Sequence, residues 1–277
     1  MAAPNALSVS PEQLSAWLPA VMDIADAAGR EIMRIYEAGF NVTLKDDRSP
    51  RTEADLAAQR MIDSALRQLT PQWPMLGEES LPEVFAQRRA WRTLWLVDPL
   101  DGTREFVKRN GEFSVNIALV EDGEPVLGVV SGPARSVLYA AARGSGAFRR
   151  GADGLCTRIQ VQLPASQPLR VLGSRSFGDA KLDRKLEELG AQQRISLGSA
   201  LKFGLLAEGS GDLYVRRGPT SEWDTAAGHA VVLEAGGSVV DLAGRPLRYN
   251  VREDVTNPSF IAYGDRTRDW VALLGGL

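Results

Sequence analysis

The sequence feature that most constrains the fold is an apolar run that ends in two carboxylates, within residues 94–103 (Leu-Trp-Leu-Val-Asp-Pro-Leu-Asp-Gly-Thr). The run at 94–97 predicts a short buried strand. We expect the strand to end at Asp98, because Pro99 cannot donate to a strand ladder and Asp101-Gly102 is a turn signal. Two carboxylates at the point where a strand gives way to a loop mark a candidate site in an α/β fold.

The residues that follow this strand predict a place for a phosphate. Gly102 and Thr103 precede a segment, 104–108, that predicts the start of a helix. Backbone N–H groups at a helix start attract phosphate oxygens, and carboxylates beside them are hard ligands for Mg²⁺. The stretch therefore indicates a magnesium-dependent phosphoryl-transfer site. A capped turn explains the same residues about equally well, since Asp-Pro and Asp-Gly are common turn dipeptides.

The composition excludes several other chemistries. The chain has one cysteine, Cys156, and one histidine, His229, which excludes an internal disulfide and thiolate metal clusters and leaves carboxylates as the main catalytic resource. Its net charge of −3 gives no basic field for nucleic acid. Without a signal-peptide pattern or a long apolar run, we expect a cytoplasmic protein with no integral membrane segment. Peripheral association with the inner membrane and the oligomeric state stay open.

Strand and helix patterns alternate along the chain around an antiparallel meander, which predicts a layered α/β protein. A turn-rich stretch near 150–168 predicts two lobes, 1–155 with most of the candidate ligands and 156–277 completing the site. The expected helices cover residues 10–36, 52–69, 179–189, 200–208 and 225–235. The expected strands cover 75–76, 94–97, 113–120, 126–131, 136–142, 169–173, 193–197, 212–215 and 238–241.

Three further carboxylates have ordinary local explanations. Asp55 stands three residues after Thr52, the capping-box position of a helix. Glu78 follows a short apolar strand in a turn where a solvated side chain is common. Asp224 lies near a helix start, where a carboxylate complements the helix dipole.

Four motifs in one order connect these carboxylates. Together they resemble the lithium-sensitive, magnesium-dependent inositol monophosphatase superfamily, over residues of about 42 to 250. The motifs are Ser-Pro-x-Thr-Glu-Ala-Asp (49–55), Gly-Glu-Glu (77–79), Asp-Pro-Leu-Asp-Gly-Thr (98–103) and Trp-Asp-Thr-Ala-Ala-Gly (223–228).

Within that superfamily the chain is more similar to the 3′(2′),5′-bisphosphate nucleotidase branch. The similarity lies in Arg-Glu-Phe at 104–106, Arg-Asn-Gly-Glu-Phe at 109–113 and Gly-Ser-Ala-Leu-Lys-Phe at 198–203. Inositol monophosphatases usually have Thr-Asn-Phe after Gly-Thr. Two residues depart from the branch pattern: Ala200 stands where a second serine is common, and Arg104 where Lys is common.

The resemblance implies an inositol monophosphatase-like sugar phosphatase fold of alternating α-β-α-β-α layers, with two or three Mg²⁺ ions. Asp55 and Thr103 would hydrogen-bond each other and orient the attacking water, with Glu78 as a further catalytic residue. Glu79 would lie behind the ligands, and Lys45 would reach the metal's outer shell or the phosphate. The implied metal ligands are Glu78, Asp98, the Leu100 carbonyl, Asp101 and Asp224. The implied substrate contacts are Leu100, Asp101, Gly102, Thr103, Ser199, Lys202 and Asp224.

The implied activity is hydrolysis of 3′-phosphoadenosine 5′-phosphate to AMP and phosphate by metal-activated water, as part of sulfur assimilation. The 5′-phosphosulfate form of the nucleotide is a second expected substrate, and Li⁺ an expected inhibitor. One alternative is an inositol monophosphatase or related sugar phosphatase. Another is a non-catalytic nucleotide-binding regulator, although all the implied carboxylates and Thr103 are present.

Overall fold

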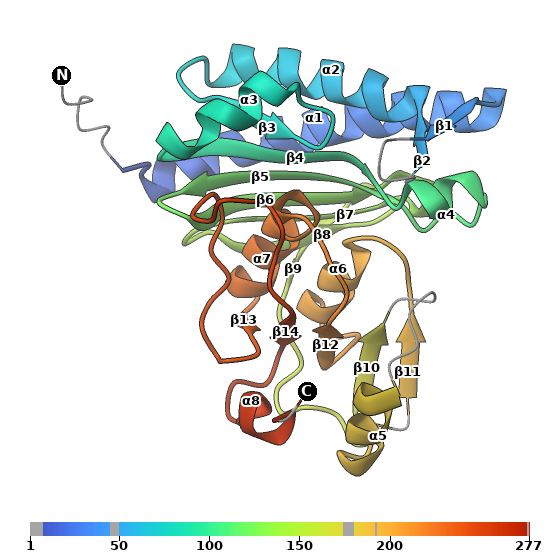
Figure 1. Ribbon diagram of the computed structural model, residues 1–277, viewed down its shortest axis with the longest axis vertical. Coiled ribbons are helices and arrows are strands. Elements are labelled where there is room, and N and C mark those ends of the chain that lie inside the picture. Colours follow the sequence, from blue (N-terminus) through green and yellow to red (C-terminus); the bar gives the residue numbers. More distant parts are fainter. Residues whose placement is uncertain (1–7, 45–49, 174–179, 192, 276) are drawn as a thin grey trace.

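The computed structural model describes residues 8–44, 50–173, 180–191, 193–275 and 277. These residues form five layers in the order α-β-α-β-α, as the resemblance implied (Figure 1). The first layer is α1 (Pro11–Ala38) and α2 (Glu53–Leu69), and the middle layer is α6 (Leu201–Ala207) and α7 (Glu222–Glu234). The last is α5 (Ala180–Glu188) and α8 (Trp270–Leu273).

A seven-stranded sheet separates the first and middle layers among the described residues, in the order β3-β4-β5-β6-β7-β8-β9. Neighbouring strands from β4 to β9 pair antiparallel, and β5 to β8 among them are the predicted meander, whereas β3 pairs with β4 in parallel. Its strands are β3 (Met75–Gly77), β4 (Thr93–Asp101), β5 (Ser114–Glu121), β6 (Glu124–Gly132), β7 (Val137–Ala142), β8 (Gly146–Arg150) and β9 (Cys156–Ile159). Shorter elements are β1 (Val42–Leu44), β2 (Pro50–Thr52), α3 (Pro82–Gln87), α4 (Thr103–Val107) and the 3₁₀ turns η1 (Arg88–Ala90) and η2 (Pro133–Arg135).

A five-stranded sheet separates the middle and last layers, in the order β11-β10-β12-β14-β13 over the described ranges. Its strands are β10 (Arg170–Gly173), β11 (Gln193–Ser196), β12 (Leu213–Arg216), β13 (Ser238–Asp241) and β14 (Phe260–Tyr263). The sequence pattern missed β1, β2, β9, β14 and α8. The seven-stranded sheet continues to Ile159, four residues beyond the proposed lobe boundary at 155, so a division into two lobes stays a prediction.

The predicted termination of β4 at Asp98 was wrong. The strand extends to Asp101, because its pairing with β5 is interrupted and then resumes: Asp98 lies opposite Asn116, and Asp101 lies opposite Ser114. β4 advances three residues where β5 advances two, so β4 contains a bulge with one extra residue. Pro99, which has no N–H to donate, lies inside this bulge.

Helix α7 is packed tightly between the two sheets. A Cβ atom on Gly128 of β6 would lie 2.3 Å from the carbonyl oxygen of Ala227, so only glycine permits this approach of strand and helix. Almost the whole surface of α7 is buried, including its single histidine. The Nδ1 atom of His229 lies 2.9 Å from the Tyr249 hydroxyl, so the buried ring has a polar partner.

Burial of His229 predicts acid sensitivity. Burial lowers the pKa of this imidazole to about 3. Below the unfolded pKa of about 6.5 the unfolded chain takes up a proton that the folded chain does not, which costs about 2 kcal/mol of stability at pH 5. Between pH 7.5 and pH 5 we expect the free energy of unfolding to fall by about 2 kcal/mol more in the wild type than in His229→Asn, which keeps a polar atom near the Nδ1 position. Urea unfolding of both proteins in chelator measures this difference, and equal losses would contradict it.

Candidate active site

The bulge in β4 puts both aspartates on the side of the sheet that faces α7. Before the bulge, Leu94 and Leu96 belong to the core shared with α7, and Trp95 and Val97 to the core shared with α1 and α2. Regular alternation would place Leu100 with Leu94 and Leu96, but it packs in the core shared with α1 and α2. The extra residue has therefore reversed which positions of β4 face each side of the sheet. In a regular strand, residues three apart point to opposite faces, and without the bulge the two carboxylates could not meet.

Two neighbouring elements bring further carboxylates to the same place. Gly77 of β3 pairs with Val97, and the Glu78 N–H donates to the Val97 carbonyl at 3.1 Å, so Glu78 follows β3 beside Asp98. Asp224 occupies the first turn of α7, where its Oδ2 accepts a hydrogen bond from the Ser221 N–H at 2.9 Å. The structure therefore brings together the predicted acidic ligands from three elements.

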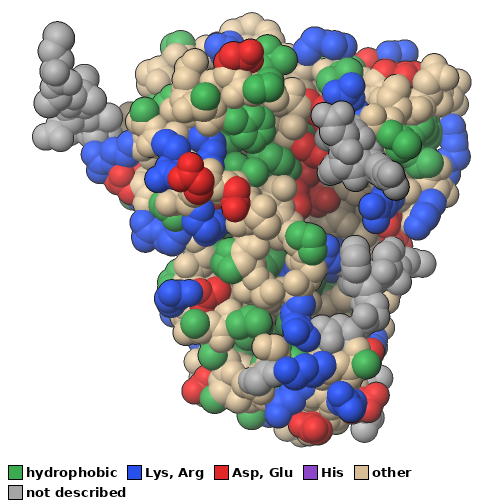
Figure 2. All heavy atoms as spheres, in the orientation of Figure 1, with side chains coloured by type: hydrophobic (Ala, Val, Ile, Leu, Met, Phe, Trp, Pro, Cys, Tyr) green, Lys and Arg blue, Asp and Glu red, His purple; other side chains and the backbone are tan. Residues whose placement is uncertain are grey.

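These carboxylates share an unfavourable electrostatic environment. Burial, and then the charges of Glu78, Asp101 and Asp224, raise the pKa of Asp98 well above its usual range. Burial and the charges of Asp101 and Glu78 do the same to the pKa of Asp224. Figure 2 shows acidic side chains gathered in a hollow between the upper layers and the lower half of the molecule. A divalent cation at this place would relieve the repulsion.

The donor chemistry fits Mg²⁺, which takes carboxylate and carbonyl oxygens. The described residues contain no ready-made cluster of three His, Cys, Asp or Glu side chains around one metal position. Instead, backbone N–H groups hold the carboxylates: Asp98 Oδ1 accepts from Leu100 at 3.0 Å, and Asp101 Oδ2 accepts from Ala200 at 2.6 Å. Hard oxygen donors and mutual repulsion together support a cation site on this chain.

Asp55 and Thr103 make the contact that the resemblance implied. Asp55 closes the capping box of α2, where its Oδ2 accepts from the Thr52 N–H and hydroxyl at 2.8 and 2.7 Å. The Thr103 hydroxyl lies 3.3 Å from the other oxygen, Oδ1, and 3.3 Å from the Leu100 carbonyl. Burial raises the pKa of the Asp55 carboxyl to about 6. The capping role and the contact with Thr103 are therefore both present, on different oxygens.

A pocket of about 140 Å³ opens beside the aspartates. Its lining includes the predicted substrate contacts Asp101, Gly102, Ser199, Lys202 and Asp224. Gly102 precedes α4 as its N-cap residue and has a φ of +91°, a conformation that favours glycine. As at any helix start, the first N–H groups of α4 have no intrahelical acceptors.

The lining of the same pocket includes arginines that the sequence did not indicate as site residues. Arg104 and Arg216 line it, together with the ring of Tyr214. In the sequence, Arg104 begins the Arg-Glu-Phe motif and stands where Lys is common, and neither observation assigns it to a substrate pocket. Arg216 ends β12, and nothing in its local pattern separates it from a solvated arginine at a strand end.

Lys202 is buried, and its ammonium group donates to the carbonyls of Leu197 and Ser199 at 3.1 and 2.6 Å. Burial lowers its pKa to about 8, although the nearby charge of Asp101 opposes the shift. Lys202 thus stabilises the loop that holds Ser199, and its contact with a substrate phosphate stays a prediction. Lys45 lies outside the described residues.

Comparisons with known proteins agree with this architecture. The family model described as "Inositol monophosphatase family" matches residues 13–269. The 3′(2′),5′-bisphosphate nucleotidase CysQ of Escherichia coli K12 is 49% identical over 245 residues, covering 88% of this chain and 98% of that protein. The CysQ of Haemophilus influenzae is 37% identical, covering 90% and 93%.

Solved structures with the same fold include CysQ from Bacteroides thetaiotaomicron, described as a bacterial member of the inositol monophosphatase family. It superimposes with a TM-score of 0.77 at 39% identity, covering 90% of this chain and 97% of that one. An IMPase from Thermotoga maritima superimposes with a TM-score of 0.76 at 30% identity, covering 94% and 96%.

Proposed function

The chain belongs to the inositol monophosphatase family, and from this premise we propose that it is a 3′(2′),5′-bisphosphate nucleotidase. The family and branch inferred from the motifs are confirmed by the family model and by relatives of that name. The reaction is hydrolysis of 3′-phosphoadenosine 5′-phosphate. The oxygen of water bonds to the phosphorus of the 3′-phosphate, the bond from that phosphorus to the ribose 3′-oxygen breaks, and the ribose oxygen takes up a proton, so that AMP and phosphate are released.

The observation that carries this proposal is the opposition of charges in one pocket. The acidic Asp101 and Asp224 and the cationic Arg104, Lys202 and Arg216 belong to the same lining. A substrate with two phosphates matches both kinds of charge, because one phosphate can share the carboxylates' cation while the other meets positively charged side chains. A substrate with a single phosphate would use only one of these two kinds of charge.

Members of this family are typically metal-dependent, and we assign two or three Mg²⁺ ions to this site. Glu78, Asp98, Asp101, Asp224 and the Leu100 carbonyl would hold them. Bound there, Mg²⁺ would neutralise phosphate charge and lower the pKa of a water molecule.

The remaining steps belong to side chains and backbone groups of the chain. Asp55 accepts the hydrogen bond of Thr103, which turns the lone pairs of the Thr103 oxygen toward the attacking water and holds that water in line. The N–H groups of Gly102 and Thr103 hold the scissile phosphate at the start of α4. No side chain is needed as a covalent nucleophile.

Further parts of the proposal follow from the branch. The 5′-phosphosulfate form of the nucleotide is a second substrate, the cellular role is in sulfur assimilation in the cytoplasm, and Li⁺ inhibits at a Mg²⁺ position. Across the described ranges, no helix is both long enough and apolar enough to span a bilayer.

The direct test is phosphate release from 3′-phosphoadenosine 5′-phosphate and from inositol 1-phosphate, each with Mg²⁺, with chelator and with added Li⁺. We expect strong preference for the nucleotide, loss of release in chelator and suppression by Li⁺. Preference for the inositol ester would overturn the substrate while keeping the metal site, an outcome worth testing because an IMPase shares the fold. Binding of the nucleotide without release from either ester would favour a regulator.

A further inference from the structure

A polar network around the buried Glu222 joins residues 250–257, here called the strap, to the start of α7. The Glu222 N–H donates to the Val255 carbonyl at 2.8 Å, and the Asn257 N–H donates to the Thr220 carbonyl at 2.8 Å. Between them Ser221 and Thr256 form an antiparallel bridge. The strap therefore pairs with the residues that immediately precede Asp224.

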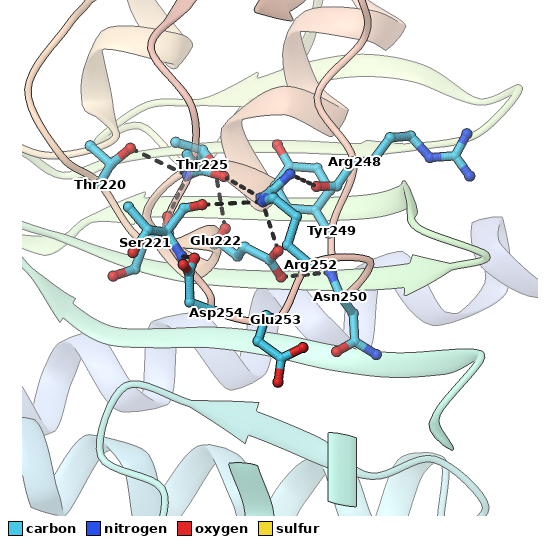
Figure 3. A network of polar contacts seen from close by, with 12 residues as sticks. Thr220, Ser221, Glu222, Thr225, Arg248, Tyr249, Asn250, Arg252, Glu253 and Asp254 are labelled. Carbon is cyan, nitrogen blue, oxygen red and sulfur yellow. Dashed lines mark hydrogen bonds and ion pairs between the residues drawn. The ribbon is translucent and has the colours of Figure 1, made fainter. Parts of the chain in front are cut away.

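Glu222 anchors the first turn of α7 to the strap. Its side chain is fully buried, and its two carboxylate oxygens have separate partners (Figure 3). Oε1 accepts from Nη2 of Arg252 at 3.0 Å, and Oε2 accepts from the Asn250 N–H at 2.6 Å. A buried carboxylate is tolerated only when it is paired in this way, so displacement of the strap would displace the helix start as well.

Arg252 also fixes the shape of the strap. Its Nη1 donates to the Arg248 carbonyl at 2.9 Å and its Nε to the Thr256 carbonyl at 3.2 Å. One planar guanidinium thus bonds both flanks of the strap and Glu222 at once. A lysine keeps the charge but lacks the fork of donors that makes these three contacts together.

Asn250 connects the same network to the residues that precede β4. Its Nδ2 donates to the carbonyls of Arg88 and Trp91 at 2.7 and 3.0 Å, and its Oδ1 accepts from Nη1 of Arg88 at 2.9 Å. Asn250 has a φ of +56°, a region that asparagine tolerates better than most residues. Arg88 is itself buried and lies five residues before β4 begins.

We propose that the strap is a positioning element of the metal site. Glu222, Arg252 and Asn250 tie the start of α7, which carries Asp224, to the segment that leads into β4, which carries Asp98 and Asp101. The network thereby sets the separation of the two ligand-bearing elements and the affinity for Mg²⁺. This inference rests on the proposed function, because it assigns a purpose to the spacing of those aspartates.

The test is Mg²⁺ binding measured by titration calorimetry on the folded, substrate-free protein, together with its thermal midpoint. We expect Arg252→Lys to weaken Mg²⁺ binding by about 10-fold, the scale seen when groups that orient metal ligands are changed. Glu222→Gln, which keeps the shape of the side chain and an acceptor for Asn250, should weaken binding in the same direction and carries the test if Arg252→Lys does not fold.

Arg170→Lys is the matched control. Arg170 contacts Asp212 through Nε and Nη2 at 3.1 and 3.0 Å, and Asp212 is as fully buried as Glu222. This pair joins β10 to the start of β12 and has no part in the strap. We expect the control to lower the thermal midpoint as Arg252→Lys does but to leave Mg²⁺ affinity within about twofold, since distant sites act independently.

The outcomes separate this inference from the proposed function. If the wild type binds Mg²⁺ and releases phosphate while the strap variants bind it as tightly as the control, the strap is only structural and the positioning inference is wrong. If the wild type neither binds Mg²⁺ nor hydrolyses the nucleotide, the proposed function itself fails, and the inference with it.

Discussion

Asp98→Asn is expected to abolish phosphate release and, at the same time, to stabilise the metal-free protein. Asp98 is buried, and its pKa is raised by burial and by the charges of three neighbouring carboxylates. Asparagine has no ionisable group for these neighbours to repel, and it can still accept the hydrogen bond from the Leu100 N–H. Without metal the folded state therefore gains stability, and with Mg²⁺ it loses a ligand.

We expect turnover to fall by at least about 100-fold and the Mg²⁺-dependent rise in thermal midpoint to shrink. Phosphate release and thermal unfolding with and without chelator measure both effects. Asp212→Asn is the control of opposite sign: the charge that it removes is paired with Arg170, so the metal-free midpoint should fall and the response to Mg²⁺ should stay. Near-wild-type turnover of Asp98→Asn at saturating Mg²⁺ would remove Asp98 from the metal ligands.

Thr103→Ala is expected to separate catalysis from metal binding. The Thr103 hydroxyl lies between Asp55 and the Leu100 carbonyl. Thr103 itself is not one of the proposed metal ligands. Its loss leaves the attacking water without orientation, so we expect kcat to fall by about 100-fold or more while half-saturating Mg²⁺ changes by less than about threefold. Steady-state kinetics over a range of Mg²⁺ concentrations measures both quantities.

Thr103→Ser is the matched control, because it restores the hydroxyl without the methyl group. We expect it to recover most of the turnover. A variant Thr103→Ala that keeps its turnover but needs far more Mg²⁺ would show the reverse of the proposed role and place Thr103 among the metal-binding groups.

The sequence predicted best those parts of the structure that depend on neighbouring residues. Helices α1 and α2 carry continuous apolar stripes and begin at the capping residues Ser10 and Thr52, as expected. For Asp55 the two rival interpretations, helix cap and site residue, turned out to be compatible, because one carboxylate oxygen bonds Thr52 and the other Thr103. Nothing local indicated that both contacts would form.

The parts that the sequence did not predict depend on residues far apart along the chain. β14 pairs with β12 and β13 after an irregular stretch, and no periodic pattern marks it. The network around Glu222 joins residues that are about thirty positions apart and reaches back to Arg88, more than 160 positions before Arg252. The continuation of β4 beyond Pro99 depends on the partner strand β5, which supplies the resumed pairing at Ser114.

The bulge in β4 has a consequence for how this site can change over evolutionary time. Asp98 and Asp101 face the same side only because β4 has one residue more than β5 between the two pairings. Deleting Pro99 or Leu100, or inserting one residue beside them, would turn one carboxylate to the opposite face of the sheet, among the apolar side chains beneath α1 and α2. Point substitutions can therefore change this segment one side chain at a time. A single insertion or deletion, in contrast, moves one of the two aspartates out of the site at once.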